Sequence, residues 1–108
     1  MNEHDKEYDL RQFKRMLQAI NGYKEVMQNN NLEDLRKVIA DLDALRSSLA
    51  VKSEWFVKQF DPRWATLEEV YAMLLDHDET HLDEIGRNLV GEAINNIESL
   101  IQSEISKG

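Results

Sequence analysis

The sequence predicts an all-α fold: an antiparallel helical bundle of three long helices plus one short helix, forming one domain over residues 1–108. Apolar residues recur at steps of three and four, and strand-like alternation is absent. Residue types that favour helix dominate, and one proline and four glycines leave few positions that force a turn. Apolar residues make up 42% of the chain, which is enough for one core and argues against disorder.

The first helix is expected over residues 5–28. Its apolar stripe consists of Leu10, Phe13, Met16, Leu17, Ile20, Tyr23 and Met27. The pair Asn21-Gly22 is a common turn signal, but at 100° per residue both positions fall outside the stripe. We therefore expect one continuous helix with Gly22 on its outer face, at a cost of about 1 kcal/mol relative to alanine.

The second helix is expected over residues 32–60, because Asn31 suits the N-cap position before it. Its apolar face consists of Leu32, Leu35, Val38, Ile39, Leu42, Leu45 and Leu49. The serine-rich stretch 47–53 is the point at which this helix could bend or break. Pro62 disfavours helix at the residue before it, so the helix is expected to stop by residue 60.

Asp61 and Pro62 also form a start signal, with aspartate as N-cap and proline at the first helical position. They predict a short third helix over residues 62–76. Its apolar face consists of Leu67, Val70, Tyr71 and Leu74. The six consecutive polar residues 76–81 predict a turn after it, because such a run cannot enter a core without a large desolvation cost.

The last helix is expected over residues 81–105, with Thr80 as its N-cap. Its apolar face is assigned to Leu82, Ile85, Leu89, Ala93, Ile97, Leu100 and Ile101. Gly86 flanks this face and could admit a close neighbour, whereas Gly91 is expected to point outward.

The net charge of −8 resides in one half of the chain. Residues 1–60 hold ten acids and ten bases, and residues 61–108 hold eleven acids and three bases. Nucleic-acid binding requires a basic surface, so the charge argues against that class and for a protein partner with a basic surface. The polar N-terminus, the lack of cysteine and the lack of a long apolar stretch predict a cytoplasmic protein without membrane contact.

An acidic cluster is the main candidate for partner binding. It consists of Glu68, Glu69, Asp76, Asp78, Glu79, Asp83 and Glu84. No basic residue interrupts it, and the alternative interpretation is a solvated face that keeps the protein in solution. Trp64 is added to the candidate site as the tryptophan expected to be exposed, whereas the neighbouring aromatic residues are expected to fill the core.

Two histidines raise a metal-binding alternative. His77 and His81 are four residues apart, a spacing that can bind a metal together with a carboxylate when both lie on one helix. The predicted turn falls between them, so we interpret them as turn residues. The sequence has no glycine-rich phosphate loop and no nucleophile elbow, so neither catalysis nor a cofactor is expected.

The leading hypothesis is therefore a small acidic helical protein-binding module. By charge and fold class, its functional analogues would be inhibitor or immunity-type proteins of bacteria or phage that occupy a basic surface of a target. One alternative is a homodimeric structural or adaptor protein, which requires an apolar patch left over on the monomer, for example at Ile94, Ile101 and Ile105. A second alternative is a metal-binding helical protein that uses His77 and His81.

Overall fold

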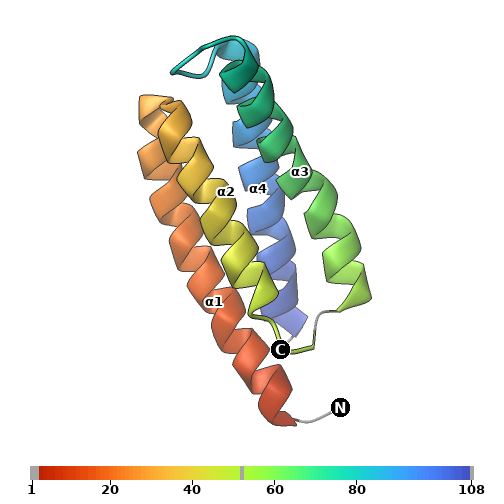
Figure 1. The fold of residues 1–108 in the computed structure, drawn as a ribbon. Helices are drawn as coiled ribbons and strands as arrows, with labels where there is room; N and C mark the ends of the chain where they lie inside the picture. The colour runs from red at the N-terminus through yellow and green to blue at the C-terminus, as the bar shows by residue number, and fades with distance from the viewer. Residues whose placement is uncertain (1–2, 52, 108) are drawn as a thin grey trace.

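The computed structural model describes residues 3–51 and 53–107, and it confirms the all-α bundle (Figure 1). The helices are α1 (Glu3–Val26), the 3-10 turn η1 (Met27–Asn29), α2 (Leu32–Ser47), α3 (Glu54–Asp76) and α4 (Glu84–Lys107). Over the described ranges, the only strand-type pairing is an isolated bridge between Asn31 and His81. The molecule measures 48 × 22 × 18 Å, because the helices lie side by side along one axis.

Two connections meet at one end of the bundle and hold each other in place. The α1–α2 and α3–α4 connections lie together there, and the α2–α3 connection lies at the other end, near the start of α1 and the end of α4 (Figure 1). The Leu32 amide donates to the Thr80 carbonyl at 2.9 Å, and the Leu82 amide donates to the Asn30 carbonyl at 2.8 Å. These two bonds fix the turn that carries much of the acidic cluster against the start of α2.

The core runs along the bundle axis and takes side chains from all four helices. In α1 and η1 the buried apolar row is Phe13, Met16, Ile20, Tyr23 and Met27. This row keeps the spacing of three and four that was predicted, and the helix continues through Asn21 and Gly22 as expected. Toward the end of the bundle that holds the α2–α3 connection, the Phe56 ring packs edge-on against the Phe13 ring, with centroids 5.1 Å apart. It also stacks on the Phe60 ring, with centroids 5.5 Å apart.

The predicted helix over residues 32–60 is not continuous, because α2 ends at Ser47 and α3 begins at Glu54. The break falls in the serine-rich stretch 47–53, where the sequence indicated that this helix could bend or break. The break is stabilised from a distance by Asp9, a buried residue of α1. Its carboxylate accepts hydrogen bonds from the amides of Ala50 at 2.6 Å and Val51 at 2.9 Å. These amides no longer belong to a helix, so a buried acceptor from another helix stabilises the break.

The prediction that Pro62 separates two helices is also wrong, since α3 runs continuously from Glu54 to Asp76. Proline inside a helix removes one hydrogen bond and typically costs about 3 kcal/mol. Neighbouring side chains bind backbone carbonyls of this stretch: Arg63 donates to the Gln59 carbonyl at 2.8 Å, and Thr66 donates to the Pro62 carbonyl at 3.2 Å. Asp61, predicted as an N-cap, instead binds Arg46 of α2.

The last helix begins three residues later than expected, at Glu84. The Asp83 carboxylate, not Thr80, caps it by accepting from the Gly86 amide at 2.7 Å, and the Thr80 hydroxyl lies 2.9 Å from Nδ1 of His81. The buried residues of α4 are Gly86, Val90, Ala93, Ile94, Ile97 and Ile101. Ile85 and Leu89, predicted for the core, are exposed.

Candidate partner-binding site

The acidic cluster surrounds the connection between α3 and α4. Glu68 and Glu69 lie on α3, Asp76 is its last residue, and Glu84 is the first residue of α4. Asp78 occupies the left-handed region with φ of 55°. All seven acidic residues are exposed, and the predicted exposure of the polar run 76–81 is confirmed.

None of these seven carboxylates takes part in an ion pair within residues 3–51 and 53–107. The ion pairs in that part of the protein are Lys24–Glu98, Glu33–Arg36, Arg46–Asp61, Glu54–Lys58 and Glu104–Lys107. In the described part of the chain, the acidic end of the bundle therefore carries seven carboxylates that no ion pair neutralises.

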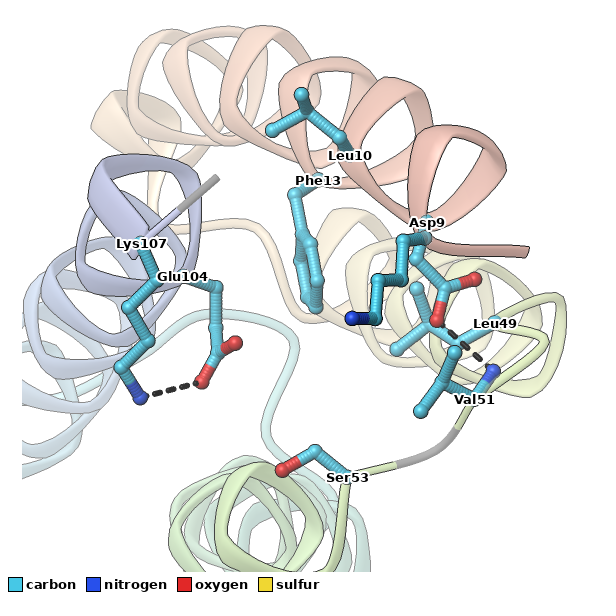
Figure 2. A pocket seen from close by; sticks show the side chains of 9 residues that line it. Asp9, Leu10, Phe13, Leu49, Val51, Ser53, Glu104 and Lys107 are labelled. Carbon is cyan, nitrogen blue, oxygen red and sulfur yellow. Dashed lines mark hydrogen bonds and ion pairs between the residues drawn. The ribbon is translucent and has the colours of Figure 1, made fainter. Parts of the chain in front are cut away.

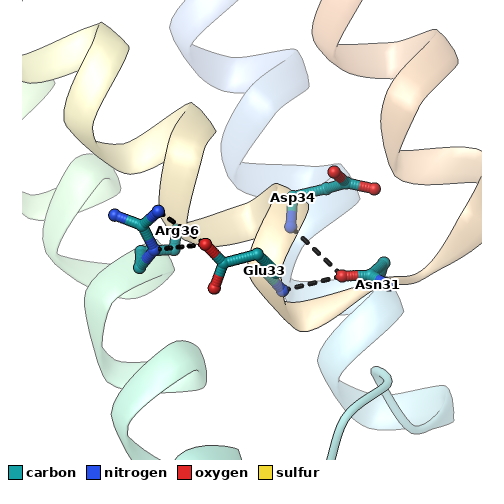
Figure 3. Close-up of polar contacts among 4 residues, drawn as sticks. All are labelled: Asn31, Glu33, Asp34 and Arg36. Carbon is teal, nitrogen blue, oxygen red and sulfur yellow. Dashed lines mark hydrogen bonds and ion pairs between the residues drawn. The ribbon is translucent and has the colours of Figure 1, made fainter.

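The basic residue nearest to this end on α2 is already engaged. Arg36 and Glu69 line the same depression between α2 and α3. Arg36 nevertheless binds Glu33 of its own helix, through Nε at 2.8 Å and Nη2 at 2.5 Å (Figure 3). This hydrogen bond lowers the pKa of the Glu33 carboxyl and raises the pKa of Arg36. The Asn31 side chain caps the same helix by accepting from the Glu33 amide at 2.8 Å, which confirms its predicted role.

The structure spreads the acidic cluster over two helices and the turn between them. Glu68 borders a depression between α2 and α3 that is also lined by Arg36, Ile39 and Glu69. At 100° per residue, Asp76 lies about 80° from Glu68 and about 20° from Glu69 around α3. Asp83 is used in part as the cap of α4. The seven residues therefore share one end of the molecule, and Asp83 also serves the fold.

Trp64 does not have the exposure that was predicted for it. Its ring is half-buried against the core, and its indole nitrogen donates to the Ile39 carbonyl at 3.0 Å, so it anchors α3 to α2. The exposed tryptophan is Trp55, at 46% of its full accessibility. The indole hydrogen bond of Trp64 explains the difference, because a half-buried N–H needs an acceptor and Ile39 supplies one.

An exposed apolar row lies beside the acidic residues and was missed by sequence reasoning. It consists of Met73, Ile85 and Leu89, which are 43%, 67% and 39% exposed. The signal that could have revealed it is Gly86: a row through Gly86, Val90, Ala93, Ile97 and Ile101 also has helical spacing and leaves Ile85 and Leu89 outside. Ile94 and Ile101, considered as a leftover patch, are buried instead.

The two histidines flank the turn rather than share a helical face. His77 caps the end of α3, and its Nδ1 lies 2.7 Å from the Met73 carbonyl, so this nitrogen carries a hydrogen. His81 belongs to the bridge with Asn31. Over the described residues, no group of three or more histidine, aspartate or glutamate side chains has the arrangement of a metal site.

A cavity of about 300 Å³ lies at the opposite end of the bundle, between the start of α1, the α2–α3 connection and the end of α4 (Figure 2). Leu10, Phe13, Leu49 and Val51 form its apolar lining. Most of the polar groups around it already have partners within the protein. Asp9 binds the amides of the connection, Ser53 caps α3, and Glu104 pairs with Lys107 at 3.2 Å.

Comparison with protein-family models, with curated proteins and with solved structures gave no match for this chain. Among the helices of the described residues, none combines the length and the apolar character that crossing a bilayer requires.

Proposed function

We propose that this protein is an acidic helical binding module that occupies a basic surface of another protein. The observation that carries the proposal is the set of seven exposed carboxylates at one end of the bundle, none of them ion-paired within residues 3–51 and 53–107. Uncompensated charge of one sign speeds the encounter with a partner of opposite sign and suppresses wrong partners. By charge and fold class alone, the functional analogues would be inhibitor or immunity-type proteins that occupy a basic target.

Two of the acidic residues have a simpler explanation, and two do not. Asp83 and Glu84 favour the start of α4, because negative charge stabilises a helix N-terminus. Asp76 is the last residue of α3, and Glu79 follows it by three residues. Negative charge at the C-terminal end of a helix interacts unfavourably with the helix dipole. A basic partner would offset the cost of exposed charge that opposes a helix dipole.

The test uses charge neutralisation of the acidic end in the full chain. The variant Glu68→Gln, Glu69→Gln, Asp76→Asn, Glu79→Gln removes four charges, and the control Glu3→Gln, Glu7→Gln, Glu25→Gln, Asp43→Asn removes four other exposed charges. Each protein is immobilised and incubated with native lysate at low and high salt. We expect the unmodified chain and the control to retain the same protein from the lysate at low salt. The acidic-end variant should not retain it.

Purified partner then gives the kinetics. Neutralisation should slow association and reduce its salt dependence, because exposed charges at an interface act mainly on the encounter rate. Retention of the same proteins by all three chains would contradict the proposal and leave the acidic end as a solubilising surface.

A further inference from the structure

Lys107 and Trp55 show which sides of α3 and α4 face each other along the outside of the bundle. The Lys107 ammonium nitrogen lies 4.3 Å from the centroid of the Trp55 ring. Trp55 is at the start of α3 and Lys107 at the end of α4, so the two helices present one shared outer face at this end. The ammonium covers part of an aromatic surface that would otherwise be open to water.

The helical repeat carries this outer face to the acidic end. Met73 follows Trp55 by 18 residues, and Leu89 precedes Lys107 by 18 residues, which is five full turns in each case. The two helices α3 and α4 run in opposite directions (Figure 1). By the helical repeat, Met73 and Leu89 therefore occupy at the acidic end the positions that Trp55 and Lys107 occupy at the other. Ile85 lies one turn from Leu89. We call Met73, Ile85 and Leu89 the outer row.

The two helices are close together beneath the outer row. A Cβ atom added at Gly86 would lie 3.4 Å from a side-chain carbon of Val70 and 3.5 Å from one of Leu74. The backbone of α4 therefore comes near the side chains of α3 at the level of the outer row, whose members lie on both helices.

Acidic side chains border the outer row on both helices. Glu69 precedes Met73 by four residues, Asp76 follows it by three, and Glu92 follows Leu89 by three, so each lies about one turn from an apolar member. All three are exposed, and the ion pairs of residues 3–51 and 53–107 do not include them.

We infer that the outer row docks a basic amphipathic helix of a partner protein. This inference rests on the proposed function and deepens it by naming the chemistry of the partner. Two adjacent helices receive a third along the line between them, and the third helix would supply apolar residues at three- and four-residue spacing. Lysine or arginine on its two edges would meet Glu69 and Asp76 on one side and Glu92 on the other.

A second copy of this chain is the less suitable occupant. A two-fold axis through the outer row would bring three carboxylates of one copy near the same three of the other, and like charges across an interface oppose association. A basic helix both covers the apolar side chains and neutralises the carboxylates.

The probe is a synthetic 18-residue helix of leucine and lysine with all leucines on one face. One control peptide has glutamate in place of lysine, and another has the same composition in scrambled order. Binding is followed by methyl NMR of the full chain. We expect the amphipathic basic peptide to shift the methyl signals of Met73, Ile85 and Leu89 saturably, with a dissociation constant on the order of tens of micromolar. The two control peptides should leave these signals unchanged.

A matched pair of variants tests the surface. Ile85→Gln with Leu89→Gln should weaken peptide binding at least tenfold. Leu75→Gln is the control, because Leu75 is 53% exposed but borders a depression lined by Asn31, Leu32 and Tyr71, on the α2 side. The affinity of the Leu75→Gln variant for the peptide should remain unchanged. Circular dichroism checks that each variant is folded.

Four outcomes of the peptide and oligomer measurements would overturn the inference. The amphipathic peptide could fail to bind, or it could shift methyl signals away from the outer row. The Leu75→Gln control could lose as much peptide affinity as the variant with Ile85→Gln and Leu89→Gln. The free protein could form a dimer that dissociates when Ile85 and Leu89 are replaced by glutamine. The last result would assign the outer row to a second copy. A partner could instead be captured from lysate in a salt-sensitive way that requires the carboxylates but not Ile85 and Leu89. That result would support the proposed function and contradict the docking of a helix on the outer row.

Discussion

Arg46 of α2 holds Asp61 of α3 through two parallel hydrogen bonds, Nε to Oδ1 and Nη2 to Oδ2, both 2.9 Å long. This geometry joins two helices next to Pro62, where α3 lacks a backbone hydrogen bond. The arginine side chain is 24% exposed and the aspartate side chain 48% exposed, so the pair is only partly screened by solvent. We infer that it helps to keep α3 continuous across the proline.

The first prediction concerns this ion pair. A double-mutant cycle with Arg46→Gln and Asp61→Asn should give a coupling energy of about 1 kcal/mol, because paired, partly buried and bidentate charges exceed the usual surface value. Urea denaturation measures it. The cycle Glu54→Gln with Lys58→Gln is the control, since that pair is exposed and should give less. Equal coupling in both cycles would show that the bidentate geometry adds nothing.

The sequence predicted those features that depend on neighbouring residues. Asn31 caps α2, and the helix passes through Asn21 and Gly22, because capping and helical phase are local properties. The break after Ser47 falls within the stretch 47–53 that its serines marked as a weak point, but the Asp9 carboxylate that accepts from its amides is 41 residues away from Ala50 in the chain. Such long-range contacts cannot be read from a local pattern.

The candidate site was predicted in part for the same reason. The exposure of the acidic cluster follows from a polar run, which the sequence displays directly. The outer row was missed because Ile85 and Leu89 are apolar and fit helical spacing. In the structure Gly86 is buried and faces Val70, so the buried face of α4 differs from the predicted one and leaves Ile85 and Leu89 exposed. A glycine in a core position carries no hydrophobic signal.

The second prediction compares two glycines of α4. Gly86→Ala should lower stability by about 1–3 kcal/mol, because its Cβ would lie 2.9 Å from Oδ1 of the capping residue Asp83 and tight against Val70. Gly91→Ala should raise stability by up to about 1 kcal/mol, because its Cβ would meet nothing within 4 Å and alanine favours helix. Thermal unfolding of both variants checks the signs. If Gly86→Ala raised stability instead, α3 and α4 would have to move apart at this position without a cost in free energy.

The third prediction concerns stability at alkaline pH. Tyr23 is buried in the core and donates to the Asp41 carboxylate. Burial, and then the hydrogen bond to Asp41, raise the pKa of Tyr23 above its ordinary value of 10.0. The folded pKa is thus higher than the unfolded one, so this contribution to stability is complete below pH 10 and declines as pH rises further, by up to about 1.4 kcal/mol per pH unit.

The variant Tyr23→Phe removes this titration. The stability difference between the unmodified chain and Tyr23→Phe should be constant below about pH 9.5 and shrink above pH 10, as measured by urea denaturation over a pH series. Tyr8→Phe, which removes an exposed hydroxyl from the same helix, serves as the control. A difference that grows above pH 10 would have the wrong sign for a buried neutral phenol.

The fourth prediction tests whether the acidic end reduces the stability of the free protein. Asp76 is the last residue of α3 and Glu84 the first residue of α4, so their charges meet opposite ends of two helix dipoles. Asp76→Asn should raise the free energy of unfolding by about 0.3–1 kcal/mol, and Glu84→Gln should lower it by a similar amount. Both effects should fade between roughly 10 mM and 500 mM salt, because screening acts on exposed charges. If Asp76→Asn raises the free energy of unfolding at low salt while Glu84→Gln lowers it, the Asp76 carboxylate carries a cost to folding. If Asp76→Asn lowers the free energy of unfolding instead, the carboxylate contributes to the fold and needs no partner to explain it.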